Sequence, residues 1–125
     1  MKRARTALLM SLALMAATGV NAGDAAAGAK VFAAECSECH SVHEGKDKKG
    51  PSLFGIVDAK AAQRAGFAYS DSLRASAIVW SRDNLTAYIA NPKKLVPGGK
   101  MKYDGLADAK QREDLVSYLE TPTKR

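Results

Sequence analysis

The chain has few cysteines to cross-link a small protein and no long apolar run of the kind that crosses a membrane. It contains two cysteines in 125 residues, which excludes a framework of several disulfides. Only four prolines and 6% aromatic residues are present, whereas hydrophobic residues make up 46% and charged residues 26%. This length and composition fit one globular domain. No apolar and polar alternation is long enough to predict a sheet, so the expected fold class is all-α.

The N-terminal segment lacks the length of a membrane-spanning helix. Its basic residues are Lys2, Arg3 and Arg5, and an uncharged stretch rich in Leu, Met and Ala follows over residues 6–17. A spanning helix needs about 20 apolar residues, so the alternative of an uncleaved membrane anchor is disfavoured. The small residues Val20 and Ala22 suit signal peptidase. We therefore expect a secretory signal peptide at residues 1–22 and a mature domain at residues 23–125.

A strongly basic surface is also lacking once the leader is removed. The whole chain has 19 basic and 13 acidic residues, a net charge of +6, and three of the basic residues lie in the leader. The lysines are not interleaved with aromatic residues, and an exported protein does not meet nucleic acid. Nucleic-acid binding is therefore not expected.

The two cysteines lie in one short motif, Cys36-Ser37-Glu38-Cys39-His40. This C-x-x-C-H spacing is typical of covalent haem attachment. In a helical turn, cysteines three residues apart present both sulfurs on one side, where they can form thioethers with the two haem vinyl groups. The next residue then projects its imidazole at the iron. The motif predicts one covalent haem c attached through Cys36 and Cys39, with His40 as an iron ligand.

Two other uses of these residues are less favoured. A redox disulfide between Cys36 and Cys39 would need a thioredoxin-like βαβ setting, which the sequence does not indicate. A zinc site would use both cysteines together with His40 and His43. Structural zinc sites usually take their ligands from two separated pairs, and neighbouring Cys39 and His40 point in different directions.

Methionine is scarce beyond the leader, and this scarcity bears on the sixth iron ligand. Of the four methionines, only Met101 follows Met15. His43 is the only other histidine and lies too close to His40 to reach the opposite haem face. Core packing is the alternative role for Met101, but its neighbours form the turn-rich, charged loop 97–102. With His40 and Met101 as ligands no position is open for a substrate, so one-electron transfer is favoured over an enzyme or gas sensor.

Helix signals occur at four places in the mature chain. The predicted helices are a segment from Asp24 to about Cys36, a short helix capped at Ser70-Asp71 and ending at Ala75, Arg82 to Ala90 capped by Ser81, and Asp108 to Glu120. Residues 52–69 show no period and are expected to be irregular. The ring N–H of a haem-ligating histidine normally meets a carbonyl, and that of Pro51 is the expected acceptor for His40.

Together these motifs resemble a class I c-type cytochrome, of the soluble bacterial kind similar to mitochondrial cytochrome c. The motifs are Gly23-Asp24, Gly28 with Phe32, Cys36 to His40, Gly50 to Leu53, Gly66 to Tyr69, Trp80, Asn91 to Lys94, Pro97 to Met101, and Arg112 to Leu115.

The resemblance implies roles for several further residues. Tyr69 and Trp80 would hydrogen-bond a buried haem propionate, and Tyr88 would reach the methionine sulfur. Gly28 and Phe32 would lie where the first and last helices cross, against Leu115 and Tyr118.

The resemblance also implies the setting in which the protein works. It would be a monomeric periplasmic carrier, not an enzyme, with a cytochrome bc-type complex as donor. The acceptor would be an oxidase, a photosynthetic reaction centre or a peroxidase. Clustered charge at Lys93, Lys94 and Lys100 would steer docking with an acidic partner.

The chain departs from the family pattern at three positions. Ala59 stands where an arginine often lies near the inner propionate, Leu73 where an asparagine is common, and Gly99 in place of a threonine. Without a fixed positive charge at position 59, the oxidised haem is less destabilised. We therefore expect a lower reduction potential.

Overall fold

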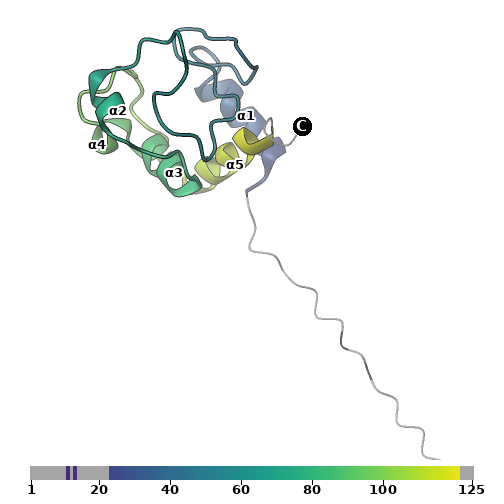
Figure 1. The fold of residues 1–125 in the computed structure, drawn as a ribbon. Helices are drawn as coiled ribbons and strands as arrows, with labels where there is room; N and C mark the ends of the chain where they lie inside the picture. Colours follow the sequence, from purple (N-terminus) through teal and green to yellow (C-terminus); the bar gives the residue numbers. More distant parts are fainter. Residues whose placement is uncertain (1–10, 12, 14–22, 122–125) are drawn as a thin grey trace, which may run out of the picture.

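The computed structural model describes residues 11, 13 and 23–121 and shows five helices joined by long irregular segments (Figure 1). The helices are α1 (Ala25–Glu35), α2 (Asp71–Ala75), α3 (Arg82–Ala90), α4 (Pro92–Leu95) and α5 (Ala109–Glu120). The only β pairing among these residues is an isolated antiparallel bridge between Lys60 and Val79. The expected all-α fold is confirmed. The expected signal peptide lies outside the described residues, apart from residues 11 and 13.

Short polar side chains set the starts of the two long helices. The carboxylate of Asp24 accepts from the backbone N–H groups of Ala26 and Ala27 over 2.8 and 3.1 Å. That of Asp108 accepts from the N–H of Gln111 over 2.9 Å. These bonds satisfy donors that the first helical turn leaves free. Both helices therefore begin directly after their capping aspartate. Asp24 was the predicted cap of α1, whereas Asp108 was expected as the first residue of the last helix and instead caps it.

Helices α1 and α5 cross in close contact at Gly28. A methyl group on Gly28 would lie 1.9 Å from the carbonyl oxygen of Asp114, so only glycine allows this approach. One turn further on, the rings of Phe32 and Tyr118 pack with their centroids 5.5 Å apart. Phe32 also shares a buried cluster with Leu115. The predicted crossing is confirmed, and it packs α1 against α5.

A buried carboxylate joins the start of α1 to α5. Asp114 Oδ1 accepts from the backbone N–H of Asp24 over 2.8 Å and also bonds Lys110. The side chain of Asp114 is only 8% exposed. These two donors, Lys110 first, hold the pKa of Asp114 below its usual value. The carboxylate therefore stays ionised and ties the start of α1 to α5.

Helix α3 has its predicted bounds, and α4 follows it after one residue. The backbone N–H of Asn91 donates to the carbonyl of Ala87 over 3.2 Å, which ends α3. The side chain of Asn91 accepts from the N–H of Lys94 over 3.2 Å, and Pro92 occupies the first turn of α4. Asn91 therefore ends one helix and begins the next. The sequence had indicated only the ending.

The irregular chain between α1 and α2 covers much of one side of the molecule. In Figure 1 it runs in teal between the α1–α5 pair and α3. Backbone bonds hold it to the next segment, because Asp58 N–H donates to Trp80 O and Trp80 N–H donates to Ala59 O, each over 2.8 Å. Trp80 lies in a second buried cluster with Leu85 and Val116. The expected lack of periodic structure in residues 52–69 is confirmed.

Candidate functional site

The Cys36 to His40 motif continues α1 as a further turn. Cys36 N–H donates to Phe32 O over 2.9 Å, while Cys39 and His40 donate to Cys36 O over 3.1 and 2.9 Å. Cys36 and Cys39 are both free and half-buried. The α1–α5 crossing thus supports the segment that carries the two thiols and the imidazole.

The imidazole of His40 is oriented by Pro51. Its Nδ1 lies 2.7 Å from the carbonyl oxygen of Pro51. A carbonyl oxygen only accepts, so Nδ1 carries the proton and Nε2 keeps its lone pair. Burial lowers the pKa of His40 from its usual value, and the bond to Pro51 opposes that effect in part. The ring is therefore a neutral imidazole with Nε2 available as a metal ligand.

Gly50 lies against the face of this ring. A methyl group on Gly50 would lie 2.4 Å from Cε1 and 2.9 Å from Nε2 of His40. The N–H of Gly50 also donates to Cys39 O over 2.8 Å, which fixes its place beside the motif. Gly50 was noted in the sequence as part of the Gly50 to Leu53 motif, and its contact with the imidazole was not predicted.

The environment of Cys36 does not favour a thiolate. Burial raises the pKa of Cys36 to about 11, with smaller effects from Glu35 and Cys39. Redox disulfides and zinc sites both use the thiolate form, which a lowered pKa promotes. Within residues 11, 13 and 23–121, no group of three His, Cys, Asp or Glu side chains is arranged to hold a metal ion. These observations favour neither a redox disulfide nor a zinc site at Cys36.

The aromatic residues expected around a haem lie in two groups. Trp80 is buried and packs against Tyr88 of α3 with centroids 4.8 Å apart. Burial alone raises the pKa of Tyr88, and no hydrogen bond joins its hydroxyl to Met101 among the residues described. Tyr69 is half-buried and packs edge-on to Phe67 with centroids 4.9 Å apart.

Arg64 was not singled out from the sequence, yet it lies beside Tyr69 and fits the propionate side of a haem. Burial raises the pKa of Tyr69, and the nearby Arg64 opposes that rise. One guanidinium nitrogen of Arg64 pairs with Asp47 at 2.9 Å. Its Nε is buried without a hydrogen-bond partner in the described part of the chain. Guanidinium N–H groups are strong donors to carboxylates, so the unpaired donor suits a haem propionate.

Met101 lies half-buried in the irregular segment between α4 and α5. It lines an open hollow of about 710 Å³, together with Lys93, Gly99, Lys100, Lys102, Tyr103 and Asp104. Three lysines therefore surround the surface next to the expected sixth ligand. Lys94 lies on α4 beside Lys93 and is exposed but does not line the hollow.

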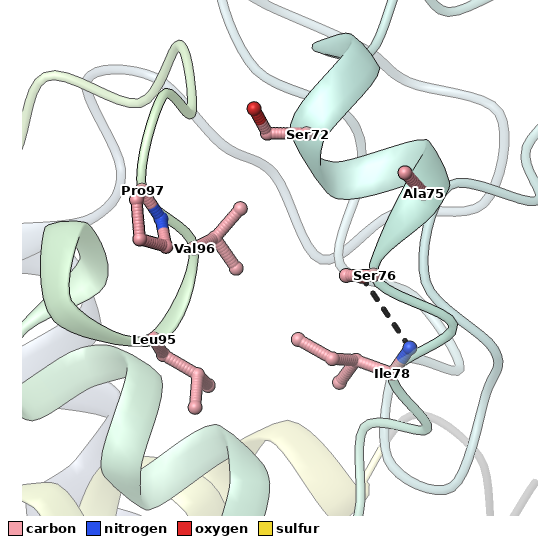
Figure 2. A pocket seen from close by; sticks show the side chains of 7 residues that line it. All are labelled: Ser72, Ala75, Ser76, Ile78, Leu95, Val96 and Pro97. Carbon is pink, nitrogen blue, oxygen red and sulfur yellow. Dashed lines mark hydrogen bonds between the residues drawn. The ribbon is translucent and has the colours of Figure 1, made fainter.

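A second hollow of about 390 Å³ separates α2 from the segment that follows α4. Figure 2 shows Leu95 and Ile78 pointing toward one another across it, with Val96 above them in this view. None of the residues expected to bind haem lines this groove.

Comparison with known proteins agrees with the fold. Residues 25–122 match the family model described as cytochrome c. The cytochrome c of Guizotia abyssinica is 41% identical over 103 residues, which cover 82% of this chain and 93% of that protein. Arabidopsis thaliana cytochrome c is 42% identical over 103 residues, covering 82% and 92%. The solved structure of cytochrome cH from Methylobacterium extorquens superposes with a TM-score of 0.74 at 45% identity, covering 79% of this chain and 99% of that one.

The fold and the C-x-x-C-H site define a class I c-type cytochrome. The chain belongs to the cytochrome c family. It carries one covalently attached haem c and is an electron carrier, not an enzyme, that reacts with redox partners. No helix in the described residues is both long and apolar enough to cross a membrane.

Proposed function

We propose that the protein is a periplasmic one-electron carrier whose haem iron is ligated by His40 and Met101. The observation that carries the proposal is the bond from His40 Nδ1 to Pro51 O, 2.7 Å long, which leaves Nε2 free to ligate. Cys36 and Cys39, half-buried on the same turn, would form the two thioethers. The bound haem supplies the ferric/ferrous couple.

Met101 would supply a neutral thioether sulfur to the sixth position. Such a soft ligand favours the ferrous state and raises the reduction potential. It is the only methionine among the described residues. The hollow beside it is open and lined in part by lysines, unlike a closed apolar pocket. Filling both axial positions leaves no place for a substrate on the iron.

The propionate side would be held by three residues. Tyr69 and Trp80 are the expected donors, and Arg64 adds a buried N–H and a positive charge close to Tyr69. Arg64 is itself braced by Asp47, whose carboxylate also accepts from the backbone N–H of Ser52 over 2.9 Å. Tyr88, which packs on Trp80, would approach the methionine sulfur.

The protein would work in the periplasm between two redox partners. Residues 1–22 would direct the chain to the periplasm and be removed there, leaving a monomer of residues 23–125. Lys93, Lys94 and Lys100 would steer docking with a cytochrome bc-type donor and with an oxidase, reaction centre or peroxidase as acceptor.

Absorbance of the oxidised holoprotein tests the ligand set. We expect a methionine-to-ferric-iron charge-transfer band in the wild type, and its loss in Met101→Ala with the thioethers intact. A high-spin ferric spectrum in the wild type would instead support an open iron site, as in a gas sensor, and would contradict the proposal. Timing the oxidation of reduced protein by each acceptor class would identify the partner.

A further inference from the structure

The segment that carries Met101 is held to the rest of the protein by very few bonds. Before it, Gly99 N–H donates to Val96 O over 3.2 Å, and after it Leu106 N–H donates to Ile89 O over 2.9 Å. Among the described residues, no backbone hydrogen bond joins residues 100–105 to any other segment. No backbone hydrogen bond therefore fixes the position of this segment, here called the Met101 loop.

Among the described residues, two polar side-chain contacts reach the Met101 loop. Lys93 pairs with Asp104 at 3.8 Å, but Lys93 is 74% exposed and Asp104 is fully exposed. Solvated pairs of this kind contribute little stability. The other contact is the hydroxyl of Tyr103, which donates to Glu35 Oε2 over 2.8 Å across 68 residues of sequence. A bond to a carboxylate is stronger than one between neutral groups.

The ring of Tyr103 strengthens this second contact. Tyr103 is half-buried and packs against the cluster of Phe32, Leu106 and Leu115, as Cys36 also does. Glu35 is the last residue of α1 and directly precedes Cys36. The bond therefore links the loop with the expected sixth ligand to the helix end with the first thioether cysteine.

We propose that Glu35 and Tyr103 form a clasp that holds the Met101 loop closed and so positions the sixth iron ligand. The clasp acts through Met101 and rests on the proposed His40 and Met101 ligation. Without it, the Met101 loop would open more often and the methionine sulfur would leave the iron more readily. Neither residue touches the iron, so both are positioning residues.

Cyanide binding to the ferric holoprotein measures this opening, because cyanide must take the place of the methionine. Tyr103→Phe keeps the ring and removes the hydroxyl, and Glu35→Ala removes the acceptor. We expect each to raise cyanide affinity by about tenfold, which corresponds to about 1.4 kcal/mol. The double variant should show no more than the larger single effect, because both changes break the same bond.

Two further variants act as matched controls. Glu44→Gln removes an exposed carboxylate elsewhere, and Asp104→Asn removes the other side-chain contact of the same loop. Both should bind cyanide as the wild type does. Amide hydrogen exchange should speed up at Leu106 of Tyr103→Phe, whose N–H bonds Ile89 O at the end of the loop, and stay unchanged in α3 and α5.

The outcomes separate the clasp from the ligand assignment. If the wild type has the methionine charge-transfer band but Tyr103→Phe and Glu35→Ala bind cyanide with wild-type affinity, the clasp is wrong. Faster exchange spread equally over α1, α3 and α5 would also overturn it, since the bond would then support the whole fold. A wild type without the band would contradict the ligand set instead.

Discussion

Gly50 packs against the imidazole of His40, and the carbonyl of Pro51 orients the same ring. A methyl group at position 50 would lie 2.4 Å from Cε1, 2.8 Å from Nδ1 and 2.9 Å from Nε2. Both nitrogens are involved, because Nδ1 bonds Pro51 and Nε2 is the proposed iron ligand. A side chain at position 50 would therefore displace both ring nitrogens from their present positions.

Gly50→Ala should displace the imidazole. The φ angle of Gly50 is not positive, so alanine adopts this backbone without strain and the ring contact alone is tested. We expect a loss of about 1–3 kcal/mol in the free energy of unfolding, together with a changed low-spin ferric spectrum. Gly45→Ala is the control, because Gly45 has a φ of 73° and no neighbour within 4 Å. It should lose stability without a spectral change, and an unaltered spectrum in Gly50→Ala would contradict the role of the contact.

Gly28→Ala tests the helix crossing, because the close contact and helix propensity change the free energy of unfolding in opposite directions. Helix propensity alone favours alanine by about 1 kcal/mol. The contact of 1.9 Å with the Asp114 carbonyl reverses this preference, and we expect a net loss of about 3 kcal/mol in denaturant unfolding. The opposite exchange at exposed Ala26 in the same helix, Ala26→Gly, should cost about 1 kcal/mol. A Gly28→Ala protein more stable than the wild type would show that α1 and α5 do not approach so closely.

Local signals explain why four helices could be predicted with nearly correct ends. Each begins after a residue whose side chain accepts a backbone N–H, namely Asp24, Ser70, Ser81 and Asp108. Such caps act within three residues and are visible in sequence. Helix α4 was missed because its four residues are too short to show a period, and Asn91 was already used as the stop of α3.

The site residues that could be predicted also follow from local motifs, whereas the contacts that were missed join distant segments. Cys36, Cys39 and His40 follow from one pentapeptide, and Pro51 was found because a ring N–H requires an acceptor. The approach of Gly50 to the ring, the unpaired Nε of Arg64 and the bond from Tyr103 to Glu35 depend on how irregular segments fold against one another. No spacing in the sequence marks these contacts. The sequence pattern also does not fix the ligand role of Met101, which stays a prediction.

Removing Arg64 should lower the reduction potential. The expectation drawn from Ala59 assumed no fixed positive charge near the propionates, whereas Arg64 lies beside Tyr69 and leaves Nε unpaired. Arg64→Gln removes the cation and leaves the negative charge of Asp47 without its ion-pair partner, which favours the oxidised state. We expect a fall of a few tens of millivolts, since about 59 mV corresponds to a tenfold change for one electron.

Two further variants show whether the change in reduction potential comes from the position of Arg64. Arg74→Gln removes an exposed arginine from α2 and should leave the potential nearly unchanged. Ala59→Arg should raise the potential, although less than if Arg64 were absent. Equal potentials in Arg64→Gln and the wild type would remove Arg64 from the propionate side.

Acidification should weaken the link that Asp114 makes between the start of α1 and α5. The bonds from Lys110 and from Asp24 N–H lower the pKa of Asp114, so its carboxylate gains stability on folding. This stability is complete above the unfolded pKa of about 3.9 and is lost as the pH falls through the lower folded value. In denaturant titrations, Asp114→Asn should have a lower midpoint than the wild type above about pH 5. The gap should close toward pH 2, and a gap independent of pH would contradict the ionised role.

The lysines beside Met101 should control how fast the protein meets its partner. Lys93 and Lys100 line the hollow next to Met101, whereas Lys30 is an exposed lysine of α1 outside it. At low ionic strength, Lys93→Gln and Lys100→Gln should each slow electron transfer to an acidic acceptor by about two- to tenfold. Lys30→Gln should have a smaller effect, because its charge does not line the proposed contact surface. Screening at about 1 M salt should bring all three rates together, since the Debye length then falls to about 3 Å. Stopped-flow oxidation across a salt series gives the result, and equal effects of Lys30 and Lys100 would contradict docking at the Met101 face.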